Sequence, residues 1–99
     1  MHYNMAPAKL TMNELLVSLH DLPGWTTDNN AIEKGFVFKD FNEAFGFMGR
    51  VAMLSEKLGH HPDWSGVYNK VHIRLMTHEA NGITENDILM ARQIEQFTQ

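Results

Sequence analysis

Apolar residues recur at intervals of three and four in three stretches of the chain, the pattern of an α-helix with one buried face. Each stretch follows a threonine or aspartate with an acidic residue three positions later, a pairing that satisfies free amides at a helix start. These pairs are Thr11 with Glu14, Asp40 with Glu43, and Thr84 with Asp87. The stripe of the first helix is Met12, Leu15, Leu16 and Leu19. Three helices are therefore predicted, the first ending before Pro23 and the second before Gly59.

The predicted central helix is apolar on more than one side. Its stripe contains Phe41, Ala44, Phe45, Met48, Val51, Ala52 and Leu58, with Phe47 and Leu54 outside it. Such a helix buries more than one face, so either the core wraps around it or a second subunit covers it. Gly46 and Gly49 each weaken a helix interior by about 1 kcal/mol relative to alanine. We expect close helix–helix contact to compensate for them.

Two further regions have the composition and alternation of β-hairpins. The first consists of Trp25–Thr27, a turn at Asp28–Asn30 and Ile32–Lys39; the second of Trp64–Val67, a turn at Tyr68–Lys70 and a strand up to Thr77. Gly35 inside a strand predicts a bulge or a close backbone contact. Alternation in the last strand places Val71, Ile73 and Leu75 on one face, which is therefore the predicted buried face.

The expected order is helix, two strands, helix, two strands, helix. Short connections make the strands antiparallel, and the apolar faces of the helices need a sheet to cover. We predict a two-layer α+β fold, in which three helices cover one face of a four-stranded antiparallel sheet (α-β-β-α-β-β-α). The 99 residues form a single domain over residues 10–99, preceded by a flexible arm over residues 1–9.

Composition excludes several classes of protein. No apolar run approaches the ~18 residues of a transmembrane helix, so no membrane partner is expected. The absence of cysteine excludes disulfides, a thiolate nucleophile and Cys-ligated zinc, and fits a cytoplasmic protein. The net charge of −4, with basic residues spread singly, gives no surface for nucleic acid.

Histidines provide the candidate chemistry. His60 and His61 directly follow the predicted central helix, where the negative end of the helix dipole favours imidazolium and hence a general acid. His78 lies near the end of the last predicted strand, and Trp64 offers a flat surface for a planar ligand. Each also has a structural interpretation. The His60–His61 pair would be a solvated helix cap, His78 a surface residue, and Trp64 a core or interface anchor. Asp87 is predicted as a helix cap in either case.

A metal site is the alternative use of three histidines with nearby carboxylates. The spacing matches no familiar zinc signature, and adjacent histidines on a loop rarely bind the same ion. We therefore predict no metal.

Several segments together resemble the pterin-4a-carbinolamine dehydratase family over about residues 10–97. They are residues 38–48, Glu56-Lys57-Leu58-Gly59-His60-His61-Pro62-Asp63-Trp64, Val67-Tyr68-Asn69-Lys70-Val71, Thr77-His78-Glu79, Gly82-Ile83-Thr84 and Asp87. The resemblance implies the predicted fold, a homodimer or homotetramer, and no metal or organic cofactor. It implies dehydration of 4a-hydroxytetrahydropterin to quinonoid dihydropterin, which recycles the cofactor of aromatic amino acid hydroxylases.

The resemblance also implies the site residues. The active-site histidines would be His60, His61 and His78. The substrate-binding positions would be Glu56, Gly59, Pro62, Trp64, Met76, Thr77, Glu79 and Asp87. Animal members carry an aspartate where this chain has Gly59 and a serine where it has Met76, so only backbone contacts transfer at Gly59.

A second hypothesis is a non-catalytic module that keeps the fold and binds partners through its helical face. Some animal members of the family bind a homeodomain transcription factor. The complete set of three histidines favours the enzyme, because an adaptor would have no need of it.

Overall fold

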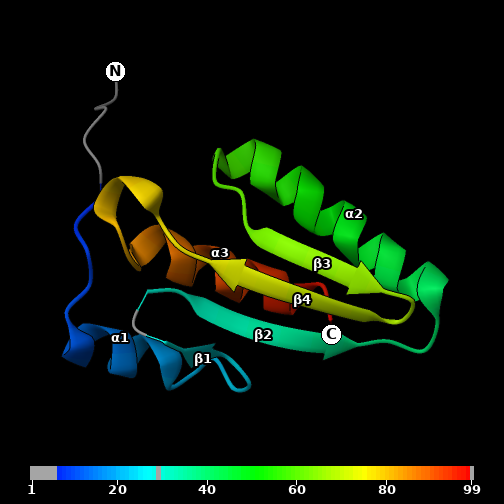
Figure 1. Cartoon of the computed structure of the whole chain (residues 1–99), viewed down its shortest axis with the longest axis horizontal. Coiled ribbons are helices and arrows are strands. Elements are labelled where there is room, and N and C mark those ends of the chain that lie inside the picture. The colour runs from blue at the N-terminus through cyan, green and yellow to red at the C-terminus, as the bar shows by residue number, and fades with distance from the viewer. Residues whose placement is uncertain (1–6, 29, 99) are drawn as a thin grey trace.

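The computed structural model describes residues 7–28 and 30–98, and Figure 1 shows the path of the chain. Its elements are α1 (Met12–Leu19), β1 (Thr26–Thr27), β2 (Ile32–Val37), α2 (Phe41–Leu58), β3 (Asp63–Val67), β4 (Lys70–Leu75), the 3₁₀ helix η1 (His78–Ala80) and α3 (Glu85–Gln96). Most of the predicted arm, residues 1–6, lies outside the described residues. Lys9, the last residue of the predicted arm, forms an isolated β-bridge with Thr84.

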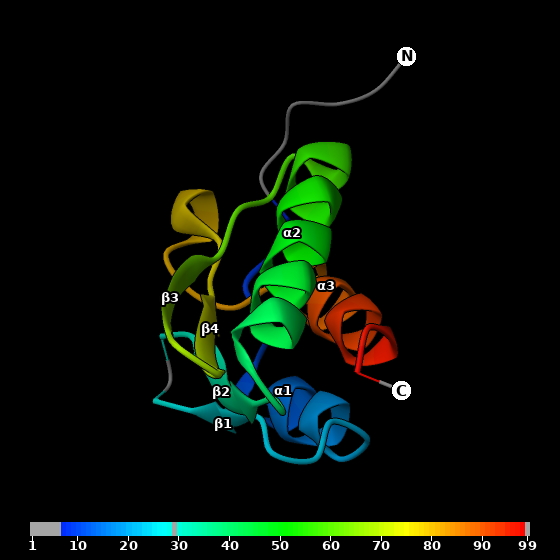
Figure 2. The same cartoon turned by 90° about the vertical axis from the view of Figure 1, so that its right-hand side faces the viewer.

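The four strands form one antiparallel sheet in the order β1-β2-β4-β3. Figure 2 shows all three α-helices on the same side of this sheet, which leaves the other face open. The predicted two-layer α+β fold is confirmed. None of the described helices has the length and apolar character needed to cross a membrane.

Helix ends follow the local sequence. Thr11 and Thr84 form complete capping boxes with the residues three positions later, and the Asp40 carboxylate accepts from the Glu43 amide at 2.9 Å. Gly59 ends α2 in the left-handed conformation, with φ 65°. The two histidines of the candidate site follow this cap directly.

The buried side of α2 differs from the predicted stripe. Phe47 and Leu54 are buried against the sheet, whereas Phe41 and Phe45 are 51% and 62% exposed. Phe47 packs with its ring centroid 4.8 Å from those of Phe36 and Phe38. The stripe is confirmed at Ala44 and Val51, which are buried, and wrong at the two exposed phenylalanines, because helical spacing identifies an apolar side without saying which side meets the sheet. The outer side of α2 thus remains apolar and uncovered within the described chain.

Predictions at three glycines and in α1 are also corrected. Gly35 pairs in regular register with His72, without a bulge, and a Cβ there would meet nothing within 4 Å. The same open space surrounds Gly46 and Gly49, so no helix among residues 7–28 and 30–98 approaches them closely. In α1 only Leu15 of the stripe is fully buried, since the neighbouring elements cover a narrow part of this short helix. The exposed members of its stripe are Met12 and Leu16.

Candidate active site

His60 lies against a fully buried carboxylate. Its amide donates to the Ser55 carbonyl at 3.2 Å, which fixes the chain immediately after α2. Its Nε2 lies 2.5 Å from Oδ1 of Asp87, and its side chain is only 15% exposed. The end of α2 is thereby joined to the start of α3, toward the same end of the sheet (Figure 1).

Asp87 is the centre of a buried polar network. Its Oδ2 accepts from the hydroxyl of Thr77 and from the amide of Thr84, both at 2.9 Å. The two threonine hydroxyls lie 2.7 Å apart. Thr77, Thr84 and Asp87 are all buried, so the contacts that connect the segment before η1 to the start of α3 are shielded from solvent, and His60 lies at the partly exposed edge of the network.

The network favours a charged His60. The hydrogen bond to Asp87 raises the pKa of His60 above its ordinary value of 6.5, and the charges of Asp87 and Glu79 act in the same direction. Burial of the ring opposes them by disfavouring the imidazolium. A raised pKa keeps a proton on His60 near neutral pH, so this side chain is suited to act as a general acid.

This pairing predicts a pH dependence of stability. Because the pKa of His60 is raised on folding, its stabilising contribution is complete below about pH 6.5 and is lost as pH rises through the folded-state pKa. We expect the free energy of unfolding in urea to fall between about pH 6 and pH 9. His60→Gln, which cannot titrate, should lose that part of the slope. Equal slopes in the two proteins would contradict the pairing.

His61 has a different environment from its neighbour. Its Nε2 lies 2.9 Å from Oε2 of Glu56, with the two side chains 60% and 82% exposed. An exposed pair of this kind contributes little to stability. His61 is therefore free to reorient toward a ligand.

His78 is exposed and opens η1, just after the buried Thr77. The amide of Thr77 donates to the Gly82 carbonyl at 2.8 Å, which closes the loop that carries His78. Among the residues described, the His78 ring makes no hydrogen bond. The Thr77–Asp87 contact brings this loop next to His60, since Asp87 binds both.

The remaining predicted site residues surround these histidines in sequence and differ in exposure. Gly59, Trp64 and Glu79 are exposed, whereas Pro62 and Met76 are half-buried. Thr77 and Asp87 are buried, so their side chains reach a ligand only through neighbouring groups. Thr84 was predicted only as a helix cap. Its local signature gave no sign of the hydroxyl contact with Thr77, seven residues away.

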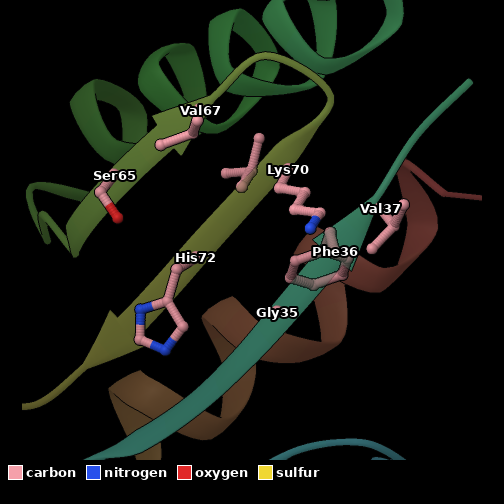
Figure 3. A pocket seen from close by; sticks show the side chains of 8 residues that line it. Gly35, Phe36, Val37, Ser65, Val67, Lys70 and His72 are labelled. Atoms are coloured by element: carbon pink, nitrogen blue, oxygen red, sulfur yellow. The ribbon is translucent and has the colours of Figure 1, made fainter. Parts of the chain in front are cut away.

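No three histidine, aspartate or glutamate side chains gather as a metal-binding group within residues 7–28 and 30–98. A hollow of about 340 Å³ does lie on the open face of the sheet, above Gly35 and His72 (Figure 3). None of the predicted site residues lines it. The chemistry of the histidines therefore argues for the site near Asp87 rather than for this hollow.

Residues 8–97 match the family model described as pterin 4 alpha carbinolamine dehydratase. A protein from Prochlorococcus marinus named "Putative pterin-4-alpha-carbinolamine dehydratase" is 52% identical, over 86% of this chain and 90% of its own length. A protein of the same name from Paraburkholderia xenovorans is 51% identical, over 91% of this chain and 96% of its own length.

Solved structures are also similar, and two of them illustrate the range of likeness. A transcriptional coactivator/pterin dehydratase from Brucella melitensis is 45% identical, with a TM-score of 0.89 over 92% of this chain and 99% of that one. A pterin dehydratase-like RuBisCO assembly factor of the alpha-carboxysome is 22% identical, with a TM-score of 0.63 over 74% of this chain and 84% of that one. At this identity the likeness shows a shared fold and nothing more.

Proposed function

The chain belongs to the pterin-4a-carbinolamine dehydratase family, and from this we propose that it dehydrates 4a-hydroxytetrahydropterin to quinonoid dihydropterin. His60, His61 and His78 are the proposed acid–base residues. One observation carries the proposal: the buried Asp87 binds His60 directly and the His78 loop through Thr77. Two segments with histidines far apart in the sequence thereby meet at one end of the fold.

The reaction suits histidine chemistry. The bond between the ring carbon and its hydroxyl breaks as a proton is delivered to the leaving oxygen, which departs as water. A proton leaves the ring nitrogen, whose electrons form the new carbon–nitrogen double bond. His60 or His61 supplies the first proton, and His78 acts as base or orienting donor. Acid–base chemistry suffices, so the proposal includes no metal or organic cofactor.

We place the pterin beside the His60–Trp64 segment and the Met76–Glu79 segment. Trp64 would stack on the ring, and exposed Glu56 and Glu79 would offer acceptors to its amino and amide groups. Gly59 can contribute only its backbone, and Met76 offers an apolar contact. Quinonoid dihydropterin must still gain two electrons and two protons from a separate reductase before a hydroxylase can use it again. We place these steps in the cytoplasm, the compartment that the cysteine-free composition favours.

A coupled assay tests the proposal. An aromatic amino acid hydroxylase generates the carbinolamine. The absorbance of the carbinolamine is followed with and without this protein. We expect the added protein to abolish the accumulation of the intermediate. Unchanged accumulation at every protein concentration would contradict the enzyme and favour a non-catalytic binding module. The name of the Brucella relative supports that alternative, because it describes that protein as a transcriptional coactivator as well as a pterin dehydratase.

We also propose a homodimer or homotetramer that uses the outer side of α2. Exposed apolar residues there are Phe41, Phe45 and Met53. So large an apolar surface on a small domain marks an interaction site. The spread of single charges and the net charge of −4 favour neither nucleic acid nor a membrane as the partner.

Light scattering tests this assembly. We expect a dimer or tetramer at micromolar concentration, and dissociation when a charge is introduced by Phe45→Glu. Val17→Glu is the control, because Val17 is 75% exposed on α1, away from this surface. A wild-type particle of 11.4 kDa would contradict the prediction.

A further inference from the structure

The buried hydroxyls near His60 have only one consistent direction of hydrogen bonding. The Thr77 hydroxyl has a single proton, which it donates to Oδ2 of Asp87. The 2.7 Å contact between the hydroxyls must therefore use the proton of Thr84. Thr84 Oγ1 in turn accepts from the Asn86 amide at 3.2 Å. The chain of donors runs from the start of α3 through Thr84 and Thr77 to the carboxylate.

Every partner of the carboxylate is thus a donor. Oδ2 already accepts two hydrogen bonds, from the Thr77 hydroxyl and the Thr84 amide. Donors and a helix N-terminus stabilise the ionised form of a buried carboxylate. Oδ1 remains for His60, and an ionised carboxylate can only accept. The nitrogen of His60 that faces it, Nε2, must therefore carry a proton.

We propose that Thr84, Thr77 and Asp87 are positioning residues that hold His60 with its proton on Nε2, so that His60 meets the substrate through Nδ1. The consequence for catalysis rests on the proposed dehydratase function. Neutral His60 then has a bare Nδ1, and charged His60 has a proton there to donate. The atom that transfers the proton is selected by groups that never touch the substrate.

The other charges near His60 do not compete for Nε2. Asp87 faces the ring from α3, and Glu79 acts on it from η1 through charge alone. Glu56, on α2, binds His61 instead. The choice of nitrogen therefore depends on the Asp87 network.

Asp87→Asn should reverse which nitrogen of neutral His60 carries the proton. The Thr77 hydroxyl and the Thr84 amide both donate to the Oδ2 position, so the amide oxygen of asparagine must lie there. Its NH₂ then faces His60 Nε2, which has to accept. Neutral His60 should therefore move its proton to Nδ1, so that the substrate meets a protonated Nδ1 where the wild type presents a bare one. We expect kcat to fall by roughly 10²-fold or more, with the alkaline limb of the pH profile displaced to lower pH because the charge that raises the pKa of His60 is gone.

Nitrogen-15 spectra of the histidine rings, recorded without ligand between about pH 5 and pH 9, test the inference directly. Wild-type His60 should show the proton on Nε2 when neutral, and Asp87→Asn the proton on Nδ1. The matched control is Glu33→Gln, because Glu33 lies 2.9 Å from Nε2 of His72 on the open face of the sheet. That change should alter His72 alone and leave the rate unchanged.

The role of Thr77 is tested in the Asp87→Asn background. Adding Thr77→Val removes one of the two donors that orient the amide, so His60 should exchange between both neutral forms. Adding Thr77→Ser instead should retain the single Nδ1–H form. An Asp87→Asn/Thr77→Val spectrum identical to that of Asp87→Asn would remove Thr77 from the proposal.

The outcomes separate this inference from the proposed function. A wild-type His60 that carries its neutral proton on Nδ1 overturns the inference, whether or not any variant folds. So does an active Asp87→Asn protein that keeps Nε2–H. If the spectra change as expected but the wild type has no dehydratase activity, the network stands and the proposed function fails.

Discussion

Replacement of His61 or His78 by alanine is expected to lower kcat/KM for carbinolamine dehydration by ~10²–10⁴-fold, which corresponds to roughly 3–5 kcal/mol of barrier. Adjacent histidines can partly replace each other. The double change at His60 and His61 should therefore cost far more than the milder of the two single changes. The coupled assay, with steady-state kinetics for each variant, measures the effect.

His72→Ala is the control for these variants, because His72 lies on the open face of the sheet in an ion pair with Glu33. Its rate should stay within a few-fold of the wild type. Equal damage from His72→Ala and His78→Ala, with both proteins folded, would show that the site has been assigned to the wrong residues.

The structure changes the expectation for His60. The sequence alone predicts that all of the histidine variants remain folded, because none of them removes core volume. His60→Ala would, however, leave Oδ1 of the buried Asp87 carboxylate without a hydrogen-bond donor, at a cost of ~1–3 kcal/mol or more. His60→Gln is the better variant, because its amide can still donate to Asp87 while it can no longer transfer a proton.

Phe47→Ala is expected to lower the free energy of unfolding by ~3–5 kcal/mol, the typical result of truncating a buried phenylalanine. Phe47 is 1% exposed, and its ring lies between α2 and the sheet, beside Phe36 and Phe38. The loss comes from the cavity as well as from the transferred apolar surface. Urea unfolding at a protein concentration held constant across variants measures it.

Val17→Ala provides the comparison, since Val17 is 75% exposed and its truncation should change stability by no more than about 0.5 kcal/mol. If Phe47→Ala were as mild as Val17→Ala, the assignment of the inner side of α2 would be wrong.

Most of the secondary structure could be predicted because its signals are local. Thr11 with Glu14 and Thr84 with Asp87 form the expected capping boxes, and Gly59 takes the left-handed conformation. The alternation of Val71, Ile73 and Leu75 correctly identified the buried face of β4. Each signal depends on residues within about four positions, whose relative placement follows from the geometry of one helix or strand.

The orientation of α2 could not be predicted in the same way. Phe45 and Phe47 are equally apolar and two residues apart, yet only Phe47 enters the core. Helical periodicity shows that a helix has apolar sides, but the sheet it packs on determines which side is buried. Gly46 and Gly49, expected in a close contact, lie on the side that this sheet does not cover.

The candidate site also has features that are local in sequence and features that depend on how the elements pack. The sequence by itself determined the histidine motif, its place after α2 and the capping role of Asp87. Only the tertiary structure decided that Asp87 also binds His60, 27 residues away, and that Thr77 joins the same network. A cap is a contact within one helical turn, whereas these contacts exist only when α2, η1 and α3 pack at one end of the sheet. Burial then strengthens them, because a carboxylate removed from water depends on the few donors that packing brings to it.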